Sequence, residues 1–167
     1  MANPDDIMQL MKERRSIRSF KPDTIPDETI RTILEAARWC QSASNKQPWR
    51  FIVVKNKDLI KALGKCATYG NFIQEAPVIL AVVADKGTAP KWYLHDTCLV
   101  TQQICLISWA LGLGTCWIGS MDRDKAGKLL DLAKDEFLTT ILPIGYPKSI
   151  PKPTSRKNLD EIVSYKP

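Results

Sequence analysis

The feature that most constrains this chain is a long apolar stretch, Trp92 to Leu111. It predicts one helix that is apolar over most of its circumference, with these apolar side chains: Leu94, Cys98, Leu99, Val100, Ile104, Cys105, Leu106, Ile107, Trp109 and Leu111. A helix that is hydrophobic nearly all round is buried on every side. A chain of 167 residues has little material to enclose such a helix, so we predict that a second copy covers it in a homodimer.

Length and composition fit one domain that spans residues 1–167. Apolar residues make up 44% and charged residues 25%, which is typical of soluble globular proteins. No apolar run is long enough to span a bilayer, and the first six residues lack the pattern of a signal peptide. We therefore expect a cytoplasmic protein with no membrane partner.

Charge and cysteine content limit the kinds of ligand and site that this chain can have. A net charge of +6 fits nucleic acid, an anionic surface or a phosphorylated small molecule. The lysines are scattered and no nucleic-acid-binding motif is present, so we expect no nucleic-acid partner. The five cysteines are odd in number and none are spaced Cys-x-x-Cys, which argues against a disulfide framework and a metal site.

Periodic apolar patterns predict helices that alternate with four short strands. The predicted helices cover residues 4–13, 28–39, 57–66, 92–111 and 122–132, with Asp27 capping the second. The predicted strands cover residues 50–55, 77–84, 115–119 and 137–147. Residues 148–167 predict an extended tail that wraps over another surface.

Three arginines fall within five residues in the segment Arg14–Phe20. In an extended segment Arg14, Ser16 and Arg18 point to the same side. A guanidinium presents a planar fork of donors that matches phosphate oxygens, so this side is a candidate seat for a phosphate monoester. The alternative is that these cations complement the end of the preceding helix and stay solvated.

No side chain emerges as a catalytic nucleophile or general base. The single histidine, His95, lies three residues before Cys98, but no recognisable oxyanion hole accompanies this pair. Paired carboxylates cannot be singled out among 18 scattered acidic residues. We therefore predict no catalytic side chain.

The glycines after the long helix allow two interpretations of their role. The order helix, glycines, strand excludes a dinucleotide fingerprint, which requires strand, glycines, helix. Gly112 and Gly114 either end the helix, or Gly114 and Gly119 keep side chains away from a flat ligand.

A small polar loop precedes the first strand, and it also has two readings. Its residues Ser44, Asn45 and Gln47 either stabilise the loop by bonding their own backbone or use their side-chain amides to bind a heterocycle edge.

Four segments together resemble the FMN-dependent nitroreductase family, in the family's order and over nearly the whole chain: Arg14–Phe20, Ser42–Phe51, Gly112–Gly119 and Pro143–Pro147. The resemblance implies an α+β fold with a central, mostly antiparallel sheet among helices. It also implies an intertwined homodimer with two FMN molecules at the subunit interface.

The resemblance assigns roles to particular residues. Arg14, Ser16 and Arg18 would hold the FMN phosphate and ribityl oxygens, with Arg15 near the flavin and Arg156 completing the phosphate site. The loop from Ser42 to Gln47 would reach the flavin of the other subunit, through Ser42, Ser44, Asn45 and Gln47. The backbone of four residues would lie against the isoalloxazine ring: Cys116, Trp117, Ile118 and Gly119.

The implied activity is that of an FMN-dependent NAD(P)H oxidoreductase. NADH or NADPH would give hydride to flavin N5 and leave, and a nitroaromatic, quinone or similar acceptor would then take the electrons. One alternative is a non-catalytic flavin-binding dimer for storage, sensing or delivery. Another is a specialised branch for flavin destruction or reductive dehalogenation, although this chain lacks recognisable lid segments.

The chain departs from the family pattern at three places. Cys40-Gln41 stands where many relatives have a small residue and proline, and Thr154 where some have lysine. Larger relatives cover the substrate with helices where this chain has only Asp85–Lys91. We therefore expect an open acceptor site.

Overall fold

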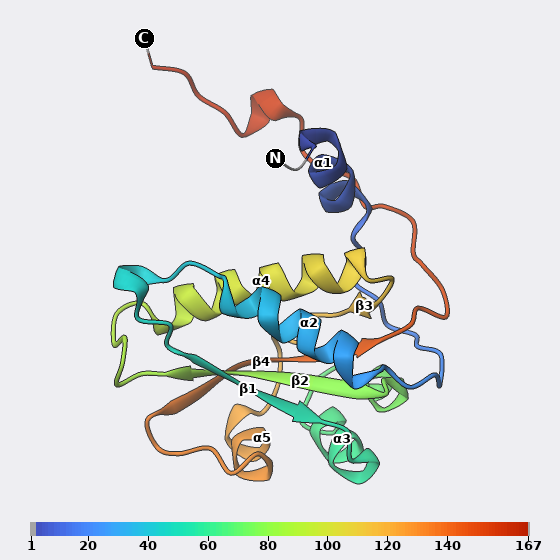
Figure 1. Cartoon of the computed structure of the whole chain (residues 1–167), viewed down its shortest axis with the longest axis vertical. Coiled ribbons are helices and arrows are strands. Elements are labelled where there is room, and N and C mark those ends of the chain that lie inside the picture. The colour runs from blue at the N-terminus through green and yellow to red at the C-terminus, as the bar shows by residue number, and fades with distance from the viewer. Residues whose placement is uncertain (1–2, 167) are drawn as a thin grey trace.

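A four-stranded antiparallel sheet forms the centre of the structure, a computed structural model that describes residues 3–166 (Figure 1). Its order is β1-β2-β4-β3, and its strands are β1 (Trp49–Val54), β2 (Val78–Asp85), β3 (Gly114–Thr115) and β4 (Glu136–Gly145). The predicted α+β fold with a mostly antiparallel sheet is thus confirmed. Only the third strand differs strongly, because it ends at Thr115 instead of residue 119.

Helices cover both faces of this sheet. Four helices do so: α2 (Asp27–Arg38) and α4 (Tyr93–Ala110) on one face, α3 (Lys57–Gly64) and α5 (Arg123–Leu129) on the other. Successive side chains of a strand point to opposite faces. Accordingly Leu80 and Val82 of β2 pack under α2 and α4, whereas Ala81 and Val83 pack against the α3 and α5 layer.

The start of α2 corrects one prediction. Pro26 occupies the cap position with φ −57° and ψ 142°, so Asp27 lies inside the first turn and does not cap the helix. The Asp27 carboxylate instead accepts from Lys55, which follows β1. This contact lowers the pKa of Asp27.

Helix α4 buries four polar residues and leaves apolar ones exposed. Asp96, Thr97, Thr101 and Ser108 are buried, whereas Leu94, Leu99 and, directly after the helix, Leu111 are exposed by 37–45%. The sequence predicts a helix that is buried on every side. Within one chain this is not the case. Among residues 3–166 no helix is both long and apolar enough to cross a bilayer.

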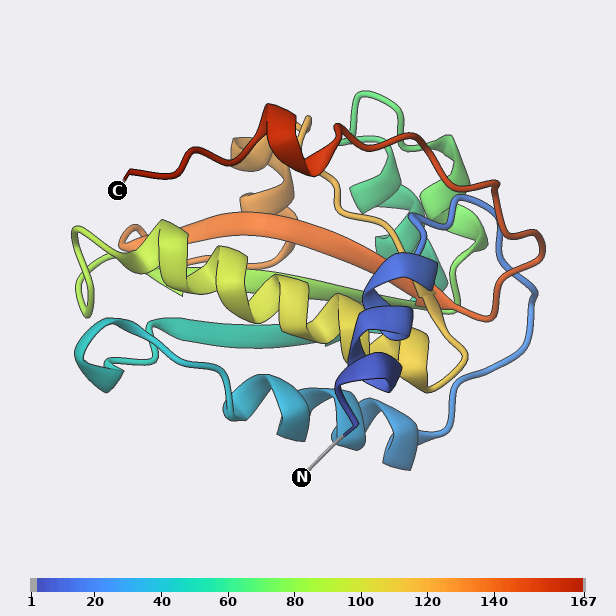
Figure 2. The ribbon, with the colours of Figure 1, turned by 90° about the horizontal axis from the view of Figure 1, so that it is seen from above.

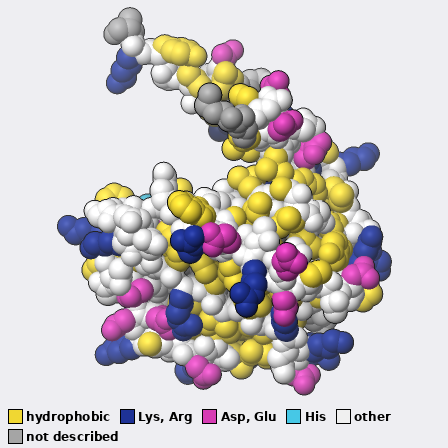
Figure 3. Space-filling view, viewed as in Figure 1, with side chains coloured by type: hydrophobic (Ala, Val, Ile, Leu, Met, Phe, Trp, Pro, Cys, Tyr) yellow, Lys and Arg dark blue, Asp and Glu magenta, His cyan; other side chains and the backbone are white. Residues whose placement is uncertain are grey.

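The two ends of the chain both lie above the body in Figure 1, but the view from above shows them apart from each other (Figures 1 and 2). Helix α1 (Pro4–Glu13) has no buried residue, and Ile7, Met8 and Met11 are about half exposed. The tail after β4 is extended apart from a short 3-10 turn, η3 (Leu159–Glu161). Hydrophobic side chains also gather on the part of the body that lies directly below both ends in this view (Figure 3).

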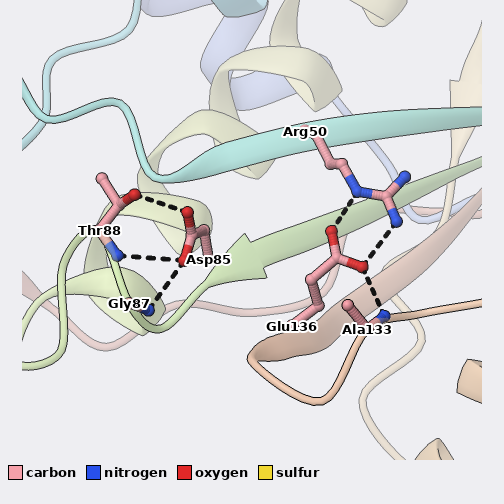
Figure 4. A network of polar contacts seen from close by, with 6 residues as sticks. All are labelled: Arg50, Asp85, Gly87, Thr88, Ala133 and Glu136. Atoms are coloured by element: carbon pink, nitrogen blue, oxygen red, sulfur yellow. Dashed lines mark hydrogen bonds and ion pairs between the residues drawn. The ribbon is translucent and has the colours of Figure 1, made fainter.

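A polar network in two separate parts lies at the end of the sheet where β1 and β4 start and β2 ends (Figure 4). Glu136 accepts from Arg50 through both carboxylate oxygens and from the Ala133 amide at 2.9 Å. Asp85 accepts from the amides of Gly87 and Thr88. The network holds the sheet end at which the polar loop enters β1.

Glu136→Gln is expected to lower the free energy of unfolding by about 1 kcal/mol or less at pH 7, because Arg50 stays partly solvated. The hydrogen bond from Arg50 holds the pKa of Glu136 below its usual value. A depressed carboxyl pKa stabilises the fold above the unfolded-state pKa, and this stabilisation disappears as pH falls through the folded-state pKa. The difference between wild type and variant in urea unfolding should therefore begin to shrink as the pH falls below about 4.3 and vanish only below the lowered folded-state pKa of Glu136; a pH-independent difference would contradict this.

Candidate functional site

The arginine segment lies directly beside β3. Ser16 forms an isolated parallel bridge with Thr115, and the Ile17 amide donates to the Thr115 carbonyl at 2.9 Å. Ile17 itself is fully buried. The contact brings the segment next to the residues that follow β3, as the predicted flavin site requires.

The glycines after α4 are explained by packing and by a turn. A Cβ at Gly114 would lie 2.3 Å from Cγ1 of Ile17, so only glycine permits this close approach. The prediction that Gly114 leaves room for a flat ligand is therefore wrong, since Ile17 fills that space. Gly112 has φ +76° directly after α4, which confirms it as a helix-ending glycine. At Gly119 an added Cβ would find no atom closer than 3.7 Å.

Arg14 and Arg18 carry their charge without a protein partner. Within residues 3–166 neither guanidinium makes an ion pair or a hydrogen bond. Burial raises the pKa of the Cys116 thiol, and the nearby charges of Arg18 and Arg14 oppose this rise. Two unpaired cations therefore lie close to the start of the Cys116–Gly119 segment.

Arg15 turns back toward helix α1. Its Nη1 donates to the carbonyls of Lys12 and Arg14, at 2.5 and 3.0 Å. Its Nε is buried and has no hydrogen-bond partner in the described chain. A buried donor without a partner is a candidate contact for a polar or anionic group of a ligand.

The Cys116–Gly119 segment leaves the sheet, which corrects the predicted strand 115–119. Its backbone bonds to side chains in place of a neighbouring strand. The Ile118 amide donates to the Thr140 hydroxyl at 3.2 Å, and the Gly119 carbonyl accepts from Arg123 at 2.9 Å. Sequence reasoning missed both side chains, although Thr140 stands out as a polar residue in an apolar strand.

The polar loop is held mainly by its own side chains. It contains a short 3-10 turn, η1 (Ala43–Asn45), and three residues with left-handed backbone, Ser44, Asn45 and Gln47. The Ser42 hydroxyl accepts from the Gln47 amide at 2.9 Å, and Gln47 Nε2 donates to Asn45. Bonding within the loop is thus confirmed for Asn45 and Gln47, and binding of a heterocycle by these residues stays a prediction.

One chain does not bring all the predicted site residues together. The polar loop lies at the start of α4 and the arginine segment at its end (Figure 1). The 18 residues of α4 give it a length of about 27 Å. Arg156 donates only within the tail, to Thr154 and Ser155. The structure therefore holds two separate parts of the predicted site.

A buried carboxylate that sequence reasoning missed ties the polar loop to α4. Asp96 is 3% exposed, and its Oδ1 accepts from the Ala43 amide at 3.1 Å. Its Oδ2 is buried without a partner in the described residues. The only sequence signal was an acidic residue in a stretch that otherwise reads as apolar.

Asp96→Ala is expected to lower the free energy of unfolding by about 1–3 kcal/mol, because the Ala43 amide loses its acceptor. Amide hydrogen exchange at Ala43 should accelerate in parallel. Asp96→Asn is the matched control, since its side-chain oxygen still accepts. Equal effects of the two substitutions on exchange at Ala43 would contradict the role of the hydrogen bond between Asp96 and the Ala43 amide.

A cavity of about 750 Å³ lies apart from these residues. None of the predicted site residues lines it. Its floor includes Phe20, Ile60 and Val78, which are already at least 96% buried, and Lys57 and Lys61 stand at its rim. Volume alone does not make it the functional site.

Comparison with known proteins identifies the family. The model of the nitroreductase family matches residues 11–71 and 64–146. A Methanothermobacter thermautotrophicus protein named NADH dehydrogenase/NAD(P)H nitroreductase is 32% identical over 87% of this chain and 80% of its own. A protein of the same name from Archaeoglobus fulgidus is 32% identical over 86% and 87%. The solved FMN-dependent nitroreductase of Clostridium difficile R20291 has a TM-score of 0.88 at 28% identity, over 96% and 99% of the two chains. The chain belongs to the nitroreductase family.

Proposed function

We propose that this protein is an FMN-dependent NAD(P)H oxidoreductase that works as a homodimer. It would take electrons from NADH or NADPH and pass them to a small acceptor such as a nitroaromatic or quinone. The observation that carries the proposal is the bridge between Ser16 and Thr115, which places two unpaired arginines beside an irregular, partly exposed backbone segment. The names of the archaeal relatives and of the Clostridium protein support it.

The arginine segment would hold the FMN phosphate. Arg14 and Arg18 would donate charge-assisted hydrogen bonds, which are stronger than neutral ones. Ser16 adds a half-buried hydroxyl between them, whereas Arg15, whose buried Nε has no partner among residues 3–166, would lie near the flavin. The chain thus offers the donors that a phosphate monoester needs.

The Cys116–Gly119 segment would support the flavin ring. Bound FMN supplies the hydride chemistry, and the protein supplies binding, orientation and local charge. Trp117 and Gly119 are exposed on this segment, whereas Cys116 and Ile118 are buried. No side-chain nucleophile is needed for this role, in keeping with the prediction that there is none.

A homodimer would bring the two parts of the site together. The exposed leucines of α4 and the apolar residues of α1 form a surface without cover in one chain. The polar loop and Arg156 would then reach the flavin held by the partner. Sedimentation of the purified protein should give twice the chain mass, and a monomer with bound FMN would contradict the proposed assembly.

The visible spectrum tests the proposed function directly. The purified protein should be yellow, or become yellow with FMN, and should bleach when NADH or NADPH is added without oxygen. Adding a quinone or nitroaromatic should restore the colour. A yellow protein that neither nicotinamide bleaches would favour the non-catalytic flavin-binding dimer. A protein that takes up no FMN would overturn the proposal.

A further inference from the structure

The backbone after β3 is fixed at its middle residue by one side chain. The Ile118 amide donates to the Thr140 hydroxyl at 3.2 Å, and the same hydroxyl oxygen lies 3.1 Å from the Ile118 carbonyl. A hydroxyl has one hydrogen and two lone pairs. The Thr140 hydroxyl therefore accepts from the Ile118 amide and can donate its one hydrogen either to the Ile118 carbonyl or to the Ile141 carbonyl, which also lies 3.1 Å away.

A bulge in β4 aims this hydroxyl at the segment. Val82 of β2 pairs with Thr140, but Val83 pairs with Leu138, so Thr139 is an extra residue in β4. Bulges of this kind redirect side chains. Thr139 contacts the α4 side, with its hydroxyl 2.8 Å from that of Thr97, whereas Thr140 contacts the segment on the opposite face.

Anchoring Ile118 decides which neighbouring groups remain free. In an extended segment alternate residues face the same way. Ile118 is 7% exposed, whereas Trp117 is 38% exposed and Gly119 is exposed. Among residues 3–166 the amides of Trp117 and Gly119 donate no hydrogen bond, so they remain available to a ligand on the outer side.

We propose that Thr140 is a positioning residue for the flavin ring. Its hydroxyl holds Ile118 inward and thereby presents the Trp117 and Gly119 amides outward. This inference rests on the proposed binding of FMN. Amide donors at the ring stabilise its reduced form more than its oxidised form, because the reduced ring carries more negative charge.

Thr140→Val tests the inference, because it removes the hydroxyl and keeps the shape. It should weaken binding of reduced FMN relative to oxidised FMN about tenfold, which lowers the two-electron midpoint potential by about 30 mV. The flavin absorption bands should shift as well. Thr140→Ser keeps the hydroxyl and should restore the wild-type potential. If Thr140→Val does not fold, Thr140→Ala provides the second hydroxyl-free variant.

Thr139→Val is the matched control. It removes a neighbouring buried hydroxyl that contacts Thr97 and does not contact the segment. Equal potentials in Thr139→Val and Thr140→Val would overturn the inference. Amide exchange at Ile118 in the protein without FMN separates the two proposals. Faster exchange in Thr140→Val alone shows that the Thr140 hydroxyl holds the Ile118 amide. Failure of the wild type to bind FMN refutes the proposed function and the flavin role of Thr140 together.

Discussion

Replacing Arg14 and Arg18 together with glutamine is expected to weaken FMN binding by roughly a hundredfold to ten-thousandfold. Each charge-assisted hydrogen bond to phosphate contributes about 1.5–3 kcal/mol, and about 1.4 kcal/mol corresponds to a factor of ten in affinity. The fold should persist, because neither guanidinium bonds to the protein within residues 3–166. Quenching of FMN fluorescence measures the affinity, and thermal unfolding without FMN measures the fold.

Arg31→Gln is the control for this pair. Arg31 is exposed on α2 and belongs to neither part of the predicted site. Its loss lowers the net charge of the chain without touching the arginine segment. A comparable loss of FMN affinity in Arg31→Gln would mean that overall charge, and not the seat formed by Arg14 and Arg18, binds the cofactor.

Gly114→Ala is expected to lower the free energy of unfolding by about 1–3 kcal/mol or more. The new Cβ would stand 2.3 Å from Cγ1 and 2.6 Å from Cβ of Ile17, closer than real Cβ contacts. Relief requires the arginine segment to move away from β3, so FMN affinity should fall with stability. Urea unfolding and FMN titration of the same preparation measure both.

Gly119→Ala is the matched substitution for the fold. An added Cβ there would meet only Trp117, at an ordinary distance of 3.7 Å. The free energy of unfolding should stay within about 0.5 kcal/mol of wild type. Equal destabilisation by the two substitutions would contradict the role of the contact between Gly114 and Ile17.

Local patterns predicted most of the fold because apolar residues recur with a clear helical or strand spacing in most elements. The prediction of helix 4–13 agrees with α1, and strand 77–84 differs from β2 by one residue at each end. The error at Asp27 arose because a capping side chain was assumed where Pro26 already sets the cap conformation. The third strand was predicted too long because two side chains take the place of its ladder partner: Thr140, which is distant in sequence, and Arg123, which follows the segment closely.

The candidate site was only partly predictable, for a related reason. Residues suited to bind a phosphate are charged, so Arg14 and Arg18 stand out in the sequence. Residues that hold a backbone in place act through single buried hydrogen bonds between distant segments, and Asp96 and Thr140 are of this kind. Their partners, Ala43 and Ile118, become visible only once the chain is folded.

The polar loop and the arginine segment lie at opposite ends of α4, so the length of this helix sets the distance between them. In a two-fold dimer each chain would contribute one end of its helix to each of the two flavins. Adding one turn to α4 would lengthen the helix by about 5.4 Å. The polar loop and the arginine segment would then be misplaced relative to each other in both flavin sites at once. Changes in length among such chains should therefore accumulate in surface loops, while the residue count of α4 stays constant.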